Sequence, residues 1–551
     1  MEKRLIIAIV LSILVLVLWQ AFLVKNPKPA TTVPAGTEIT GPGPAPVTKT
    51  PPPALEKAPA AASAEVPAEA QAAVSGASEE KARVETSLYN AEWSSRGGVL
   101  TSWKLRKHRN STGQDLELVP ELAVKTGRFP LALWSEDGAF AEAANAAVFK
   151  ATYPPIALAD GEKGEVRFEY ADGRGMKVEK IFLLTGGTYD VGIAVRAWKD
   201  GREVEPWLLW GPGIGNPSPA EMKQRFSSST GAAVLAGGKV LRMDERKYKP
   251  ETSAFAFADW AAYEENYFAA LFVLPQRAGK AVFLKEVQDA TSRFFLAVDR
   301  PGRAFIGPKE LDELKAFGDG SKKIINFGFF GSIAEILLIG IKYIHRSVPN
   351  WGLAIIIMTF IIKIIFFPLT YSSMKSMAKM AELQPKMKAL RAKYKKAKQD
   401  IQQRRQMNEE MMKLYKEHGV NPAGGCLPML IQLPVFWGVF RMLVVAVEFR
   451  HSPFALWIKD LSVKDPYYIT PLLMGATQYV QTKMTPSTAD PAQARMMLLL
   501  PVVMTVFFMN FQSGLILYWL TNNVLQIGQQ MIMNKMMAKK KREDHGTRRK
   551  D

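Results

Sequence analysis

The residue types that most often perform covalent or metal chemistry are scarce in this chain of 551 residues. Its one cysteine, Cys426, has no intrachain disulfide partner, and its Gly-Gly-Cys-Leu-Pro setting favours a small packing residue over a reactive thiol. The five histidines show no metal-ligand spacing, and no glycine-rich phosphate loop or nucleophile–base signature is present. We therefore expect no enzymatic activity, no metal site and no cofactor.

One basic residue stands in an unusual setting. Lys363 lies within an otherwise apolar run and precedes Leu369, near the end of that run, by six residues. In a helix this separation is about 9 Å. Two interpretations stay open from spacing alone. Either the lysine extends its side chain to the membrane interface, or it is a cation in a water-filled pocket, because charges inside membrane spans usually face a cavity or a partner.

Polar residues in later apolar runs could accompany this lysine. Asn522 and Gln526 are four residues apart, so they share one face of a helix. Each alone is typical of a helix–helix hydrogen bond. Together with Lys363 they predict a hydrophilic groove. The candidates for its lining are Thr359, Gln432, Asn522, Asn523 and Gln526.

Apolar runs of suitable length would position these groups across a bilayer. They are Trp351–Leu369, Cys426–Val447, Tyr467–Gln481, Met496–Asn510 and Gly514–Met533. The net charge of +19 alone is compatible with nucleic-acid binding, but Lys and Arg gather between and after these runs, which is the positive-inside pattern. The basic loop 371–420 has a helix-forming composition with Asp400 as a candidate N-cap, which predicts a cytoplasmic helical hairpin.

The composition changes twice within residues 1–317. Residues 1–25 contain an apolar run of membrane-spanning length, which fits either a cleaved signal peptide or a retained anchor. The absence of a small-residue cleavage pattern favours the anchor. Residues 26–82 are rich in Ala and Pro and predict a flexible linker. Residues 83–317 alternate apolar and polar side chains with period two, which predicts a large β-sandwich outside the cytoplasm.

The segment 322–346 allows two interpretations. Glu335, Lys342 and Arg346 share one helical face, as in an amphipathic helix that lies in the membrane interface. Reading it as a span would place the basic loop outside the cytoplasm, so we favour the interfacial helix. The remaining segments are a span at 350–370, four spans within 426–533 and a basic cytoplasmic tail at 534–551. The predicted fold is a membrane α-helical bundle of five core helices plus an N-terminal anchor helix, with a large extracytoplasmic β-sandwich domain and both termini cytoplasmic.

Several longer motifs resemble those of the YidC family of membrane-protein insertases, whose relatives serve bacteria, mitochondria and chloroplasts. The motifs are NPAGGCLP at 421–428, QLPVF at 432–436, PFALWIKDL at 453–461 and DPYYI at 465–469. With shorter matches they cover essentially all of 351–533. The anchor, linker and β-rich segment resemble the Gram-negative form of the family.

The resemblance implies an insertase and chaperone that helps nascent membrane proteins to insert, fold and assemble in the bacterial inner membrane. It acts through a hydrophilic groove open to cytoplasm and lipid. The implied partners are nascent membrane proteins, the Sec translocon, membrane lipids and the ribosome, which would meet the basic hairpin and tail.

The resemblance also assigns residues. Lys363 matches an intramembrane basic position that is commonly Arg, Tyr518 matches one member of a tyrosine pair, and Trp519 departs from it. The predicted substrate groove comprises Lys363, Thr359, Gln432, Leu433, Phe436, Tyr518, Trp519, Asn522 and Gln526. A transporter or channel-like subunit is the alternative, as is an assembly scaffold. The lack of an inverted repeat argues against transport.

Overall fold

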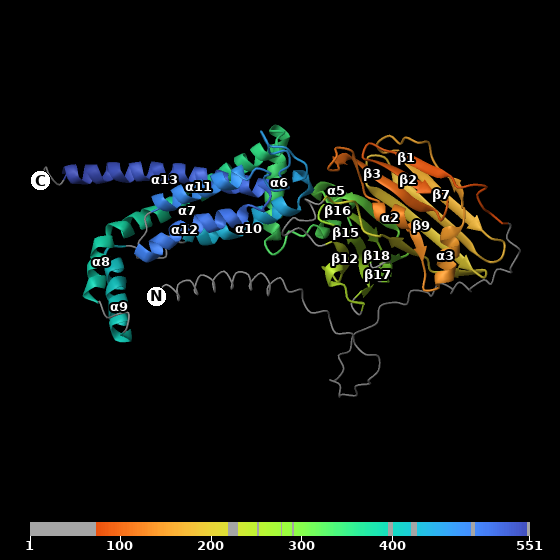
Figure 1. Ribbon diagram of the computed structural model, residues 1–551, viewed down its shortest axis with the longest axis horizontal. Coiled ribbons are helices and arrows are strands. Elements are labelled where there is room, and N and C mark those ends of the chain that lie inside the picture. Colours follow the sequence, from red (N-terminus) through yellow and green to blue (C-terminus); the bar gives the residue numbers. More distant parts are fainter. Residues whose placement is uncertain are drawn as a thin grey trace, which may run out of the picture. The chain divides into compact units, whose positions relative to one another are not determined.

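The computed structural model describes a β-rich part followed by a helical part (Figure 1). The described residues are 73–218, 230–250, 253–276, 278–288, 291–394, 400–419, 427–485 and 491–547. The predicted anchor at 1–25, most of the linker at 26–82, Cys426 and the end of the tail lie outside them. The predicted combination of a β-rich domain with a helical core is confirmed.

Three antiparallel sheets build the β-rich part. The smallest contains β1 (Lys81–Glu85), β2 (Tyr89–Ser94), β3 (Val99–Arg109) and β4 (Asp115–Glu117). The second has the order β14 (Ala254–Ala256), β17 (Lys280–Gln288), β18 (Thr291–Asp299), β11 (Trp207–Trp210) and β5 (Ala132–Trp134). The largest has the order β13 (Lys239–Asp244), β12 (Gly231–Ala236), β15 (Ala258–Glu264), β16 (Phe268–Val273), β19 (Arg303–Pro308), β9 (Asp190–Lys199), β8 (Lys177–Thr185), β7 (Lys163–Ala171) and β6 (Lys150–Thr152), with β10 (Arg202–Val204) beside β9. Short helices accompany the sheets: α2 (Glu121–Thr126), α3 (Gly138–Ala146) and α5 (Leu311–Phe317).

The period-two pattern of the sequence places alternate side chains in a common core. Val166 and Phe168 of β7 are fully buried, as are Val178 and Phe182 of β8. The strands start slightly earlier than expected, because β1 begins at Lys81. Successive strand residues point to opposite faces, so strands such as β1 alternate exposed and buried residues, whereas the central strands β12, β16 and β19 are buried on both faces.

Lys180 occupies an inward position of β8 and is fully buried. Its Nζ donates hydrogen bonds to the carbonyl oxygens of Gly97 at 2.7 Å and Leu131 at 2.9 Å. Gly97 and Gly98 both have positive φ, a conformation that glycine adopts without strain and that turns this corner under the lysine. The Lys180 side chain therefore joins the turn after β2 to the segment before β5. Burial lowers the pKa of Lys180 to about 7.

We expect the β-rich part to gain stability as pH rises from about 7 towards the ordinary lysine pKa. In that interval the unfolded chain holds a proton on Lys180 that the folded chain has released, so unfolding is disfavoured by up to about 1.4 kcal/mol per pH unit. Lys180→Met should remove this slope, whereas Lys177→Met, on the partly exposed pair with Glu179, should keep it. Thermal unfolding of the detergent-solubilised chain across this pH range tests the idea. An unchanged slope in Lys180→Met would contradict it.

The described residues of the helical part form eight α-helices. They are α6 (Gly331–Ser347), α7 (Trp351–Glu382), α8 (Gln384–Lys393), α9 (Ile401–Glu417), α10 (Leu427–Val445), α11 (Ile469–Met484), α12 (Pro491–Phe508) and α13 (Ser513–Thr547). Helix α13 contacts α7, α10 and α11, and α11 also contacts α12. Helix α7 extends beyond the predicted end of the span at residue 370 and into the segment 371–420, which was expected to form the hairpin. The two antiparallel helices of that hairpin are α8 and α9. Asp400 accepts a hydrogen bond from the Gln402 amide at 2.8 Å, so its predicted role as the N-cap of α9 is confirmed.

Helix α6 is amphipathic, as its polar spacing predicts. Glu335 pairs with Lys322 at 3.1 Å, and Lys342 pairs with Asp312 at 2.7 Å, so the charged face turns to the β-rich part. Ile336 and Tyr343 are exposed on another face. The helix starts at Gly331, later than the predicted 322.

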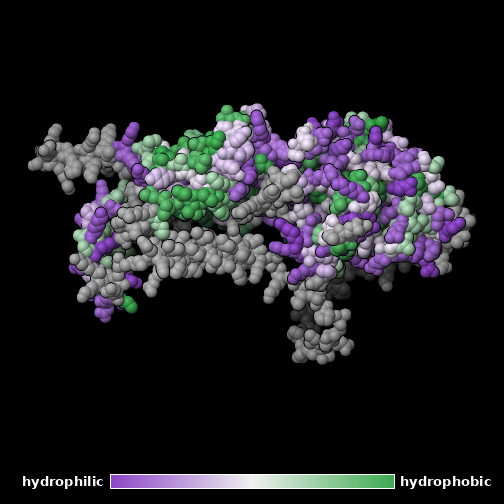
Figure 2. Space-filling model, in the orientation of Figure 1, coloured by the Kyte–Doolittle hydropathy of each residue, from purple (hydrophilic) through white to green (hydrophobic). Residues whose placement is uncertain are grey.

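Exposed apolar side chains cover the helices that follow. Figure 2 shows hydrophobic surface concentrated over the helical part and a more hydrophilic surface over the β-rich part. On α7, Ile364 and Ile365 are 56% and 66% exposed, and on α12, Leu499 and Val506 are 63% and 61% exposed. A soluble surface rarely exposes such contiguous apolar area, so these helices require a lipid environment.

Among the described helices, α7 is the one that is both long and apolar enough to cross a membrane, judged by length and composition. The apolar helical segments at Gln432–Val445 and Met496–Phe508 are shorter. The number of spans expected from the sequence therefore remains a prediction.

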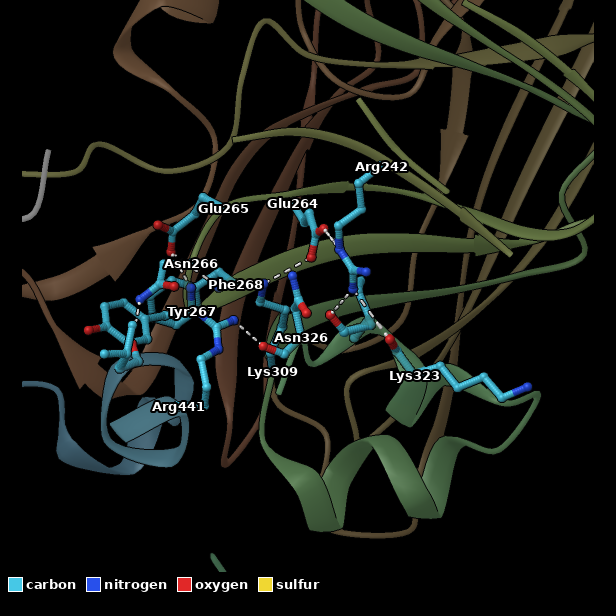
Figure 3. A network of polar contacts seen from close by, with 12 residues as sticks. Arg242, Glu264, Glu265, Asn266, Tyr267, Phe268, Lys309, Lys323, Asn326 and Arg441 are labelled. Atoms are coloured by element: carbon cyan, nitrogen blue, oxygen red, sulfur yellow. Dashed lines mark hydrogen bonds and ion pairs between the residues drawn. The ribbon is translucent and has the colours of Figure 1, made fainter. Parts of the chain in front are cut away.

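A polar network joins the β-rich part to the first turns of the helical part (Figure 3). Arg242 donates to Glu264 at 2.8 Å and to the carbonyl oxygen of Ile324 at 2.7 Å. Closer to α10, the Asn266 amide donates to the carbonyl oxygen of Val444 at 3.0 Å, and Arg441 donates to the carbonyl oxygen of Asn326. The bonds to Ile324 and Asn326 hold the chain that leads from the last strand towards α6, and the Asn266 bond links the β-rich part directly to α10.

Candidate functional site

Lys363 is half-buried on α7, and its side chain reaches across to α13. The Nζ atom donates a hydrogen bond of 2.7 Å to Oε1 of Gln526. Within the described residues no carboxylate lies within ion-pair distance of this Nζ. The charge is therefore held by a neutral amide, which orients the side chain and leaves the cation uncompensated.

The partners on α13 form a row along one face of that helix. Tyr518, Asn522 and Gln526 are spaced by four residues, so the row extends about 12 Å along the axis. Asn522 accepts a hydrogen bond of 3.2 Å from Nε2 of Gln432 on α10. Tyr518, one turn before Asn522, is buried. The structure thus brings together Lys363, Gln432, Tyr518, Asn522 and Gln526 from three helices.

An aromatic group borders this row at the end away from Lys363. The Phe436 ring lies edge-on to Trp519 with centroids 4.9 Å apart, and Tyr518 lies 6.5 Å from the same ring. The Trp519 indole donates from Nε1 to Oε1 of Gln478 on α11 at 3.1 Å. Trp519 is therefore anchored between α10 and α11, and it can serve this packing role without a tyrosine hydroxyl.

Two of the polar candidates make contacts away from the row, and one further amide was not predicted. Thr359 is buried and donates to the carbonyl oxygen of Ile355 on its own helix at 2.7 Å, so no described contact links it to the row. Asn523 is buried and donates to the carbonyl oxygen of Met474 at 3.3 Å, which is a helix-packing bond to α11. Gln478 was missed as a partner; its position as an amide inside a predicted span is the signal that could have identified it.

Leu433 has a different environment from its neighbour Gln432. It is 46% exposed, so it lies on the outer surface of α10 and not beside the polar row. Among the predicted groove residues, Gln432 therefore lies in the polar row between helices, whereas Leu433 lies on the outer surface of α10.

This arrangement can bind polar groups. The row offers one cation and several amide donors and acceptors inside a largely apolar helical part. Within the described residues there is no cluster of His, Cys, Asp and Glu suited to a metal ion. The fold and the site together define a membrane protein with a β-rich domain and a row of polar side chains between its helices.

Comparison with known proteins identifies the family to which this membrane protein belongs. Residues 81–339 match the family model described as the YidC periplasmic domain, and residues 343–541 match the one described as the 60Kd inner membrane protein. The membrane protein insertase YidC of Citrifermentans bemidjiense is 40% identical over 98% of this chain and 100% of its own length. Those of Geobacter sp. strain M21 and Syntrophus aciditrophicus are 38% and 37% identical, over 82% and 97% of this chain and 85% and 100% of their own lengths. The chain belongs to the YidC family.

Proposed function

We propose that this protein is an inner-membrane insertase that helps nascent membrane proteins to enter the bilayer, fold and assemble. Membership of the YidC family supports the activity. The observation that carries the mechanism is the intramembrane Lys363, which is held by Gln526 and has no carboxylate partner among the described residues. No observation favours a transporter or channel.

The proposed mechanism lowers the cost of moving a polar tail through hydrocarbon. A translocated segment must carry polar backbone and side-chain groups across about 30 Å of apolar core, where each unsatisfied group costs several kcal/mol. The row from Lys363 to Tyr518 offers partners for such groups along part of that distance. Acidic side chains and carbonyl groups of the tail would be favoured at Lys363, while the apolar segment leaves past Leu433 into lipid.

The proposed topology follows the distribution of charge. The hairpin and the C-terminal tail are cytoplasmic, the β-rich part is periplasmic, and the anchor at 1–25 brings the N-terminus to the cytoplasm. The helices α7, α10, α11, α12 and α13 are the proposed spans. The Sec translocon, membrane lipids and the ribosome are the proposed partners.

Reconstitution of the purified chain into liposomes tests the proposed function. We expect a small substrate with one or two spans to become protected from external protease only when the protein is present. A matched proteoliposome carrying an unrelated membrane protein controls for insertion into disturbed lipid. Solute flux without substrate protection would instead support the transporter, and an absence of both would contradict the insertase.

The basic tail provides a separate test of the ribosome contact. Residues 539–542 are Lys-Lys-Lys-Arg, and ribosomal RNA is an anion that such a cluster attracts. Deletion of the residues after Lys535 should weaken co-sedimentation of the detergent-solubilised chain with ribosomes, most strongly at low salt. Replacing the same four residues with glutamine should reproduce the loss. Unchanged co-sedimentation would remove the tail from this role.

A further inference from the structure

Helix α9 has two faces of different chemical character. On the inner face, Tyr415 is buried with Leu383 and Met387, and Met411 and Leu414 pack against this small core. The opposite face is solvent-exposed and forms one shallow surface. Its cations and apolar residues are Ile401, Arg404, Arg405, Met412, Lys413 and Lys416. We refer to this surface as the outer face of α9.

The outer face is strongly cationic. Its four basic residues are accompanied by one carboxylate, Glu409, which Arg405 holds at 3.2 Å. The neighbouring Glu410 is engaged on the other side by Lys393 of α8 at 2.9 Å. Glu409 and Glu410 are thus paired within the hairpin, and the net positive field of the four basic residues attracts an extended anionic surface.

Two exposed apolar residues favour a lipid bilayer over RNA as the anionic partner of the outer face of α9. Ile401 is 82% exposed and Met412 is 49% exposed, and they lie on the same face as the cations. The phosphate backbone of RNA provides no apolar surface that these two side chains could contact. A bilayer interface suits both kinds of residue, because apolar side chains enter the acyl boundary while basic ones stay at the phosphates.

The chain also keeps this hairpin near the membrane. Helix α7 is continuous from Trp351 to Glu382, and Lys375 is the first charged residue after Lys363. From Lys375 to Glu382 the helix rises only about 11 Å. Only Leu383 separates α7 from α8, so the hairpin starts close to the cytoplasmic headgroups if α7 crosses the bilayer as proposed.

We propose that the outer face of α9 docks on the anionic phospholipid headgroups of the membrane that α7 crosses. Docking lays the hairpin on the bilayer beside the cytoplasmic end of α7. This assignment depends on the proposed span α7 but not on insertase activity, so it can be tested without a substrate.

The full chain in nanodiscs allows the position of α9 to be measured. In a Cys426→Ser background, a fluorophore is attached at Asn408→Cys on the outer face or at Ala389→Cys on exposed α8, and headgroup spin-labelled lipid is the quencher. We expect stronger quenching at 408 than at 389 when the nanodisc contains phosphatidylglycerol. The difference should disappear in phosphatidylcholine alone. Equal quenching at both positions, or no effect of phosphatidylglycerol, would overturn the proposal.

Two variants separate charge from hydrophobic contact. Arg404→Gln with Lys413→Gln should lower the ratio of docked to undocked hairpin by about tenfold or more, whereas the charge-matched pair Lys388→Gln with Arg391→Gln on α8 should change it little. Met412→Gln should also weaken docking, by roughly threefold, although it alters no charge. If ribosomes shield position 408 in phosphatidylcholine nanodiscs and Met412→Gln has no effect, the outer face is an RNA contact and the lipid assignment fails.

Discussion

Lys363→Glu should reduce insertion of substrates with acidic tails by at least about tenfold, which corresponds to about 1.4 kcal/mol. The reversed charge repels the acidic groups that the lysine would attract within the membrane, where electrostatic interactions are strong. The helices should stay in place, because a glutamate can still accept a hydrogen bond from the Gln526 amide. Proteoliposome insertion at equal protein content measures the effect.

Matched variants define what the site requires. Lys363→Arg should retain most activity, because it keeps the charge and adds donors. Lys375→Glu makes the same charge reversal at an exposed position nearer the C-terminal end of α7 and should be much milder. A substrate with a neutral tail should be less sensitive than one with an acidic tail. If Lys363→Glu inserts acidic tails normally, the lysine does not act through its charge.

Lys309→Met should destabilise the β-rich part by about 3 kcal/mol, because it removes one partner of a buried carboxylate. Lys309 and Glu264 are each only 2% exposed at the side chain, and their charged atoms lie 2.9 Å apart (Figure 3). Arg242 also binds Glu264, at 2.8 Å, and would be the carboxylate's remaining cation. The loss should appear as faster hydrogen exchange in β15, β16 and β19 of the full chain in detergent.

Rescue and control variants make this second prediction specific. Glu264→Gln combined with Lys309→Met removes both charges, so the double variant should recover at least half of the lost stability. Lys315→Met removes a partly exposed pair with Glu335 and should cost less than about 1 kcal/mol. If Lys309→Met costs no more than Lys315→Met, the buried pair contributes little to the fold. The segment 309–328 should loosen together with the strands, because Arg242 also binds the Ile324 carbonyl.

The wider fold could be predicted from local patterns. Alternation of apolar and polar residues identified the β-rich part, since strand side chains point to opposite faces every second residue. Apolar runs with intervening Lys and Arg identified the helical part. Asp400 could be recognised as an N-cap because its partners are its own near neighbours in sequence. Boundaries were less predictable, as the extension of α7 to Glu382 shows.

The sequence by itself determined that Lys363 is a cation in an apolar run, and that Tyr518, Asn522 and Gln526 share one helix face. Only the tertiary structure decided that Lys363 meets Gln526, that Gln432 meets Asn522, and that Thr359 turns to its own backbone instead. It also placed Lys180 among three carbonyl oxygens in a core. The reason is physical: periodicity fixes which side of a helix or strand a residue occupies, whereas its partner depends on how distant segments align when they pack.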